Sequence, residues 1–177
     1  RVARALMEAA VDLLIQWQLA SKPHTLPPYD DALLRRELQL FPDWYVQQHK
    51  GITLDAGQQA ALTLSFERII ATNLDAPQVF VHRDYHSRNL MVCPDANPGI
   101  LDFQDAVRGP LTYDLVSLLR DCYIAWPEAQ VYAWVEAYRQ RLVEAGLTRV
   151  DEATFRRGFD LMGLQRHIKV LGIFCRL

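Results

Sequence analysis

The chain has 177 residues, a length typical of one domain with enough side chains for a real core. Half of its residues are hydrophobic, and its net charge of −2 argues against nucleic acid as the main partner, because phosphate-backbone binding calls for a concentrated basic face. No apolar run approaches membrane-spanning length, so no membrane partner is expected. Three cysteines at irregular spacing predict reduced, buried thiols and a cytoplasmic location.

Hydrophobic residues recur at the spacing of α-helices over much of the chain. These positions fall within residues 6–17, 62–70, 115–122 and 131–142, and in a long final segment, 155–174. A further helix is expected to begin near Asp30, after a loop marked by three prolines, and Pro42 is expected to break or kink it. Asp55 and Gln58 have the spacing of a capping box. The final segment is apolar on more than one side, which predicts a helix deep in a bundle.

Three short apolar runs predict a small β element in the middle of the chain. Residues 78–81 have the apolar, β-branched composition of a buried strand. Residues 90–93 and 100–101 form two more runs, separated by a segment rich in Pro, Asp, Asn and Gly that favours a hairpin turn. We therefore expect an α+β fold that is mostly helical and has its active site on the β element.

A polar motif occupies the loops of this β element. Asp84 and Asn89 lie five residues apart between the first two strands, and Asp102 follows the hairpin. Such a loop can present the Asp84 carboxylate to a substrate hydroxyl while the Asn89 side chain turns toward a metal. Asp102 would supply an anionic ligand that holds Mg²⁺ against the phosphates of ATP. The motif predicts phosphoryl transfer; the alternative is that Asp84 only caps a turn and Asp102 only closes the hairpin.

The motif and its flanks resemble a known family. The run His-Arg-Asp-Tyr-His-Ser-Arg-Asn-Leu-Met-Val at 82–92, with Ile-Leu-Asp-Phe-Gln-Asp at 100–105 and Gly-Pro-Leu-Thr-Tyr-Asp-Leu at 109–115, resembles the aminoglycoside phosphotransferase and choline kinase superfamily. Protein kinases usually carry Lys and Gly where this chain has His86 and Gln104. The segments 26–29, 36–44 and 165–172 resemble the bacterial kinases that phosphorylate the anomeric hydroxyl of N-acetylmuramate and N-acetylglucosamine.

The resemblance implies the C-terminal lobe of a protein-kinase-like fold that uses ATP and Mg²⁺. Asp84 corresponds to the catalytic base, and Asn89 and Asp102 correspond to the metal ligands. Met91 falls at the floor of the adenine pocket, although an apolar side chain there fits equally well as plain core. His86 is a candidate contact to a phosphate or to metal-bound water, with loop packing as the alternative.

Candidates for the acceptor-sugar site lie in the loop after Asp102, in the segment 36–44 and in the final helix. They are Asp105, Arg108, Glu37, Trp44, Arg166 and His167. A sugar site combines an aromatic face with a few polar groups. Trp44 also fits a buried position, Arg166 a salt bridge and His167 a satisfied core position. Asp114 is interpreted as a helix cap or a brace of the catalytic loop.

The chain lacks the parts that clamp ATP in such kinases. It has no Gly-x-Gly-x-x-Gly loop, and none of its three lysines lies in a strand resembling Val-Ala-Ile-Lys. It also opens on Arg1, directly in helical sequence. We therefore expect residues 1–177 to be the C-terminal catalytic and substrate lobe of a two-lobe enzyme, inactive on its own, whose N-terminal ATP-clamping lobe is absent from this chain.

Three functions are compatible with the sequence. The favoured one is ATP-dependent phosphorylation of an amino sugar, with the anomeric hydroxyl of N-acetylmuramate or N-acetylglucosamine as the best candidate. An aminoglycoside antibiotic kinase is the alternative, but its cationic substrate calls for an acidic rim, whereas the final helix carries Arg166, His167 and Lys169. A non-enzymatic pseudokinase or interaction module is the third, and the intact base and metal ligands count against it.

Overall fold

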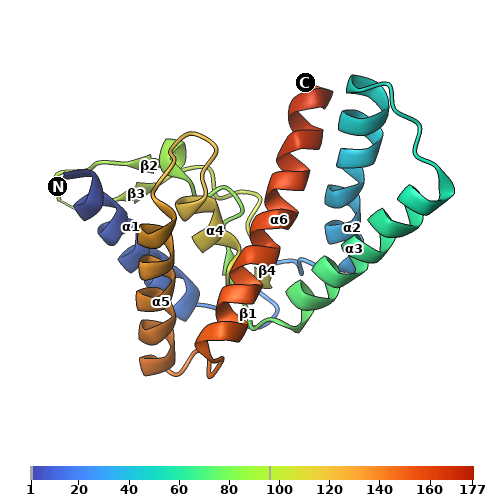
Figure 1. Ribbon diagram of the computed structural model, residues 1–177. Helices are drawn as coiled ribbons and strands as arrows, with labels where there is room; N and C mark the ends of the chain where they lie inside the picture. Colours follow the sequence, from blue (N-terminus) through green and yellow to red (C-terminus); the bar gives the residue numbers. More distant parts are fainter. Residues whose placement is uncertain (1, 96) are drawn as a thin grey trace.

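The structure is a computed structural model that describes residues 2–95 and 97–177. Its helices are α1 (Val2–Leu19), α2 (Asp31–Leu40), α3 (Ala56–Asp75), α4 (Tyr113–Leu119), α5 (Glu128–Glu144) and α6 (Glu152–Arg176). Figure 1 shows α6 in the middle of the molecule, with α1, α4 and α5 on one side and α2 and α3 on the other. With two small antiparallel sheets beside these helices, the predicted mostly helical α+β class is confirmed.

The β element consists of two antiparallel pairs. Strand β1 (Gln78–Val81) pairs with β4 (Val107–Pro110), and β2 (Leu90–Met91) pairs with β3 (Gly99–Ile100). The predicted first strand and the predicted hairpin are therefore confirmed, although the hairpin strands are only two residues long. Strand β4 was not predicted, because Gly and Pro are depleted in strands.

Tertiary contacts explain why β4 nevertheless forms. Its second edge is paired with the proline-rich loop before α2: the Tyr29 amide donates to the Arg108 carbonyl, and the Arg108 amide donates to the Pro27 carbonyl, both at 2.8 Å. Gly109 allows this close approach, since a Cβ at that position would lie 2.9 Å from the Cβ of Tyr29. The loop before α2 is thereby fixed against the β element.

The helices follow the predicted pattern closely. The Asp30 side chain accepts a hydrogen bond from the Leu33 amide at 2.9 Å, so it caps α2, and the capping box at the start of α3 is present. Pro42 does not end the helical segment that begins at Asp31. Instead the chain continues as a π-helical segment, η1 (Phe41–His49), which is consistent with a proline that has no N–H for the bond to the preceding turn.

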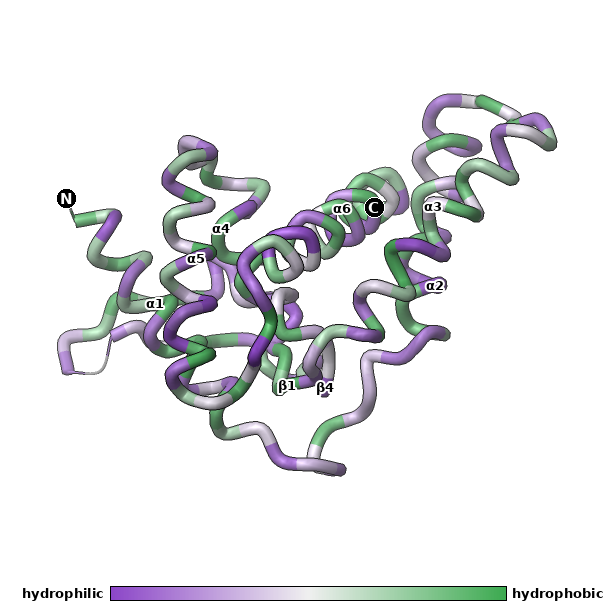
Figure 2. The backbone as a smooth tube through the Cα atoms, turned by 60° about the horizontal axis from the view of Figure 1, so that its bottom comes forward, coloured by the Kyte–Doolittle hydropathy of each residue, from purple (hydrophilic) through white to green (hydrophobic). Residues whose placement is uncertain are grey.

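The hydrophobic core lies between α1, β1, α4, α5 and α6. Fully buried side chains from these elements include Leu14, Val81, Leu115, Tyr138 and Phe159. Figure 2 shows hydrophobic and hydrophilic residues alternating along the helices, as expected of helices that are buried on one side. Within the described residues, no helix is long and apolar enough to cross a membrane.

Three expectations, about the cysteines, the length of α4 and the burial of α6, are wrong in whole or in part. Cys122 is exposed, and Cys93 and Cys175 are half-buried, so the cysteines are not core thiols. The apolar spacing over residues 115–122 suggested a longer helix, but α4 ends at Leu119 and Arg120 has left the helical conformation. Helix α6 is deeply buried only in part, because Phe174 near its end is 57% exposed.

Candidate active site

The loop between β1 and β2 carries the polar motif and is held by a buried carboxylate. The backbone amides of His82 and Arg83 donate to the two oxygens of Asp114, at 2.6 and 3.0 Å. Asp114 is fully buried in α4, and this burial raises the pKa of its carboxyl to about 7, although the two backbone donors and Arg166 act in the opposite direction. Asp114 therefore braces the loop rather than capping its helix.

Asp84 lies half-buried on this loop with its side chain available. Its backbone carbonyl accepts hydrogen bonds from the His86 amide and from the Asn89 side-chain nitrogen, both at 3.0 Å. Its carboxylate accepts no hydrogen bond from any described residue. Arg83, just before it, has a left-handed backbone with φ +76°, a conformation that costs free energy for a side chain of this kind and that concentrates at functional sites.

Asn89 and Asp102 meet where the loop joins the hairpin. The Asn89 carbonyl accepts from the Leu101 amide at 3.0 Å, which fixes the residue just before Asp102. Because the Asn89 side-chain nitrogen is bonded to Asp84, its Oδ1 atom is left as a possible metal ligand. Asp102 is exposed and has φ +69°, and among the described residues its side chain accepts a hydrogen bond only from the Gln104 side chain, at 3.2 Å.

The donor set of Asn89 and Asp102 fits a magnesium ion that is shared with phosphates. Both residues offer oxygen atoms, which Mg²⁺ prefers, and Mg²⁺ is usually held by one or two carboxylates together with substrate phosphates and water. Within residues 2–95 and 97–177, no group of three or more His, Cys, Asp or Glu side chains forms a metal cage of its own. Two protein ligands are enough for a metal ion that takes its other ligands from the phosphates of a nucleotide and from water.

His82 is a buried residue close to the carboxylates of Asp84 and Asp102. Burial lowers the pKa of its imidazole, although Asp84 and Asp102 both act to raise it. The ring packs between Trp17 of α1 and Tyr85, with centroids 6.1 and 5.9 Å away. His82 is thus a neutral core residue that packs the start of the loop against α1.

Glu37 of α2 joins three elements at one buried point. It is 4% exposed and accepts from Arg83 Nη2 at 2.7 Å and Lys169 Nζ at 2.9 Å, and also from the Tyr29 hydroxyl. Burial raises the pKa of the Glu37 carboxyl, but Lys169, Tyr29 and Arg83 outweigh it and hold the pKa below its ordinary value. The carboxylate therefore stays charged and joins α2 and α6 to the loop between β1 and β2.

A cavity of about 670 Å³ lies beside this junction, between α2, α6 and the segment that precedes β4. Two of the predicted substrate residues, Glu37 and Asp105, line it together with Arg83 and Gln104. Three further basic residues line it: Arg36 and Arg176, which the sequence did not indicate, and Lys169, which it indicated only as one of the basic residues of the final helix. Its position next to the residue before Asp84 makes it a candidate acceptor site.

The other predicted substrate residues lie elsewhere. Trp44 is half-buried in η1, and Arg108 is exposed on β4; neither lines the cavity. The guanidinium of Arg166 lies 5.2 Å from the centre of the Tyr113 ring, close to the buried Asp114. His167 is exposed, and its Nε2 atom lies 3.3 Å from the Arg120 carbonyl. Arg166 lies on the same side of α6 as Lys169, since both contact Tyr113, but neither Arg166 nor His167 lines the cavity.

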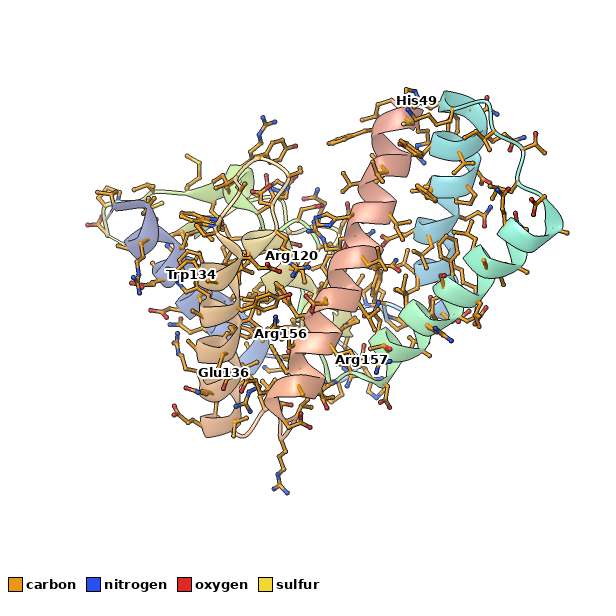
Figure 3. All side chains as sticks on the ribbon, in the orientation of Figure 1. His49, Arg120, Trp134, Glu136, Arg156 and Arg157 are labelled. Atoms are coloured by element: carbon orange, nitrogen blue, oxygen red, sulfur yellow. The ribbon has the colours of Figure 1, made fainter. Side chains whose placement is uncertain are left out.

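Arg120, at the end of α4, binds to the first half of α6. Figure 3 shows it between α4 and α6, where its Nη2 atom donates to Asp160 at 2.7 Å and to the Tyr132 hydroxyl at 2.9 Å. Gly163 of α6 accommodates it, since a Cβ there would lie 3.1 Å from Arg120 Nη1. The end of α4 is in this way locked to α5 and α6.

Met91 and His86 lie on the hairpin side of the motif. Met91 is half-exposed and lines a second, mostly apolar cavity of about 200 Å³ with Leu6 and Met7 of α1 and Trp126. The His86 ring packs edge-on against Tyr123, with centroids 5.9 Å apart, and its buried Nδ1 atom has no hydrogen-bond partner among the described residues. An apolar pocket beside the motif is compatible with a nucleotide base.

Comparison with known proteins places the chain in a family. Residues 1–153 match the phosphotransferase enzyme family, and the chain belongs to it. The family resemblance that the sequence motif indicated is confirmed.

Three relatives carry the same name, N-acetylmuramate/N-acetylglucosamine kinase. The chain is 46% identical to the Pseudomonas aeruginosa protein and 44% identical to the Neisseria meningitidis protein, each over 176 residues. It is 31% identical to the Caulobacter vibrioides protein over 185 residues. These alignments cover 99%, 98% and 97% of this chain but 52%, 52% and 49% of the relatives. The chain thus spans about half the length of the curated relatives that it matches.

Proposed function

We propose that this protein is an ATP-dependent kinase that transfers the γ-phosphoryl group to a hydroxyl of an amino sugar. The best candidate acceptor is the anomeric hydroxyl of N-acetylmuramate or N-acetylglucosamine. The observation that carries the proposal is the unbonded carboxylate of Asp84, held by a braced loop next to a cavity of sugar size. The names of three relatives support the choice of acceptor.

In this proposal each residue of the motif has one task. Asp84 orients the acceptor hydroxyl and takes its proton as the phosphoryl group is transferred. Asn89 Oδ1 and the Asp102 carboxylate would hold Mg²⁺, which neutralises phosphate charge when it is bound. Arg83 is held by its ion pair with Glu37, so its charge stabilises the position of the loop. Positioning of this kind supplies most of what phosphoryl transfer needs from a protein.

We further propose that residues 1–177 are the C-terminal catalytic and substrate lobe of a two-lobe enzyme. Two facts support this: the chain matches about half of each relative, and no lysine lies in a strand that could pair with ATP phosphates. Met91 would contact the adenine, and His86 a phosphate or metal-bound water. Such an enzyme would act in the cytoplasm, where ATP is available.

The cavity disfavours an aminoglycoside as the acceptor. Its lining has four basic side chains, Arg36, Arg83, Lys169 and Arg176, against three carboxylates, so its net charge is positive, and aminoglycosides are polycations. Like charges would repel such a substrate from the cavity mouth. A neutral or anionic sugar meets no such barrier.

A phosphorylation assay on the full-length enzyme tests the proposal. The enzyme would be given Mg-ATP with N-acetylmuramate, N-acetylglucosamine or an aminoglycoside, and the product identified by mass spectrometry and by NMR of the anomeric carbon. We expect anomeric phosphates of the two amino sugars and none of the aminoglycoside. Phosphorylation of the aminoglycoside alone would contradict the proposal.

A further inference from the structure

The acceptor cavity contains two basic side chains whose charge is not used by the protein. Of its four cations, Arg83 and Lys169 are bonded to Glu37. Arg36 and Arg176 form no ion pair or hydrogen bond with any residue in the described ranges. A guanidinium offers five donors in a planar fork, so an unpaired one that faces a cavity is ready for an anionic ligand.

The acidic residues of the cavity do not cancel this charge. Glu37 is paired with both Arg83 and Lys169, and Asp30 keeps its charge while it accepts the Leu33 amide as the cap of α2. Asp105 is exposed and can accept hydrogen bonds from neutral sugar hydroxyls. The lining as a whole has four cations and three carboxylates, so its net charge is positive.

The two arginines are placed by helix geometry. Leu33, Arg36, Glu37 and Leu40 line the cavity from α2, and Lys169, Ile173 and Arg176 line it from α6. Both sets follow the spacing of one helix face. The helices touch closely between them, because a Cβ on Gly172 would lie 2.4 Å from the backbone carbon of Leu40. The two helices run parallel, because Lys169 meets Glu37 and Gly172 meets Leu40. Arg36 and Arg176 therefore lie on opposite sides of this contact, each one turn away from it, at the two ends of the cavity.

The neighbouring Arg35 shows what a structural arginine on the same helix looks like. Its guanidinium is paired with Asp31 and with Glu67 of α3, and it does not line the cavity. Of these two adjacent residues of α2, Arg35 joins helices and Arg36 faces the candidate acceptor site. Arg35 is a matched control for Arg36.

We propose that Arg36 and Arg176 recognise a carboxylate on the acceptor sugar, so that they determine specificity for an acidic amino sugar over a neutral one. This inference rests on the proposed function and adds the group that is recognised. N-Acetylmuramate carries a lactyl ether carboxylate, and N-acetylglucosamine is the same sugar without it. The pair of arginines lowers KM for the acidic sugar, while Asp84 acts alike on both.

The test compares the two sugars in the full-length enzyme. Arg36→Ala, Arg176→Ala and the double variant should lower kcat/KM for N-acetylmuramate, mainly through KM, by about 10- to 100-fold per charge-assisted hydrogen bond lost. The kcat/KM for N-acetylglucosamine should change by less than about twofold, because no carboxylate is present to be recognised. Arg36→Lys should retain part of the preference, since it keeps the charge without the fork. Arg35→Ala should leave the ratio between the sugars unchanged.

Salt offers a second readout on the wild-type enzyme. KM for N-acetylmuramate should rise with ionic strength, and KM for N-acetylglucosamine should not, because screening weakens only the charged contact. Equal losses on both sugars in the arginine variants, or no loss on either, would overturn the inference while leaving the kinase function in place. A wild-type enzyme that phosphorylates neither sugar would overturn the proposed function itself.

Discussion

Asp84 combines a fixed backbone with an unbonded side chain. Its carbonyl is held by two donors from the following loop, and its carboxylate is left unbonded by the described residues. Asp102 is similar: it sits at a left-handed backbone position and has one weak contact. These two side chains are the ones whose removal should affect chemistry most and the fold least.

Asp84→Asn in the full-length enzyme should lower kcat by about 10²- to 10⁴-fold, because an amide cannot take the proton of the acceptor hydroxyl. The affinity for Mg-ATP should change little, since the base is not a metal ligand in this scheme. Steady-state kinetics with calorimetric titration of Mg-ATP gives both quantities. A variant that keeps near wild-type kcat would show that Asp84 is not the base.

Asp102→Ala should abolish Mg²⁺-dependent nucleotide binding in the full-length enzyme while the fold survives. The reason is that Asp102 supplies the anionic ligand and Asn89 alone offers a neutral oxygen. Calorimetric titration with Mg-ATP measures the loss, and Asp43→Ala, an exposed carboxylate of η1, is the control. Unchanged affinity would point to a structural role for Asp102.

Asp114 makes the stability of the protein depend on pH in an unusual direction. Its pKa rises from 3.8 to about 7 in the folded state, so the folded protein binds a proton that the unfolded chain releases over this range. The contribution of Asp114 to stability is therefore full below pH 3.8 and is lost as pH rises toward 7. Most buried pairs of carboxylates with cations act in the opposite sense.

Urea unfolding of the wild type and of Asp114→Asn, from about pH 5 to about pH 8, tests this direction. The free energy of unfolding of the wild type minus that of the variant should fall with rising pH, by at most about 1.4 kcal/mol per pH unit, and level off above neutrality. Asn keeps the shape of the side chain without its titration. A difference that stays constant over this range would mean that Asp114 is ionised throughout.

Among the structural elements, the contact of α6 with α2 and η1 holds the cavity wall. Gly172 lets the α6 backbone reach Leu40 where any side chain would collide with backbone atoms. Gly158 lies on the same helix, and a Cβ there would meet nothing within 4 Å. The two glycines separate the effect of helix propensity from the effect of packing.

Gly172→Ala should lower the free energy of unfolding by about 1–3 kcal/mol, because the helices must move apart to admit the methyl group. Gly158→Ala should be neutral or stabilising by up to about 1 kcal/mol, since alanine favours the helix and nothing is in its way. Chemical denaturation of both variants measures the difference. Equal stability of the two variants would contradict the close contact.

The sequence predicts elements that are stabilised locally. The capping box at Asp55 and the buried face of α5 follow from spacing alone and are confirmed. Strand β4 and segment η1 could not be predicted, because one depends on the proline-rich loop as a partner and the other on how the chain passes Pro42. Local propensity is overridden in both cases by contacts made across the fold.

The candidate site divides in the same way. Asp84, Asn89 and Asp102 fall within twenty residues of chain and are brought together by short strands that the sequence predicts. Their proposed roles remain predictions. Arg36 and Lys169 are more than a hundred residues apart and share a cavity only because α2 packs on α6. No spacing along the chain identifies which residues of α6 line the cavity, so the sequence indicates Arg166 and His167 as candidates and does not indicate Lys169 as one.

At the scale of the whole molecule, the 177-residue chain has a core of its own, but the side proposed to bind the nucleotide is open. Met91 and Phe103 near the motif are 50% and 62% exposed, and the apolar cavity beside Met91 is small. Electrostatic terms that favour the transition state are weakest where water has access. The proposed second lobe would close this side.

Residues 1–177 produced alone should therefore unfold cooperatively as a mostly helical unit, yet show no useful sugar-dependent ATP turnover. Circular dichroism and a coupled ADP assay on material of confirmed mass would test both statements, with the full-length enzyme as the positive control. Robust turnover by the 177-residue chain would refute the two-lobe proposal and would call for another source of the phosphate clamp.

Glu37 has a thermodynamic consequence for ligand binding. One carboxylate is shared by Lys169 on the cavity wall and by Arg83 next to the proposed base Asp84, so the two cations compete for it. A ligand that draws Lys169 away leaves more of the carboxylate to Arg83, and strengthens the hold on the loop that carries Asp84. By linkage, a loop held more firmly must in turn favour that ligand by the same free energy. For such a ligand, binding to the cavity and the placing of Asp84 are governed by a single equilibrium.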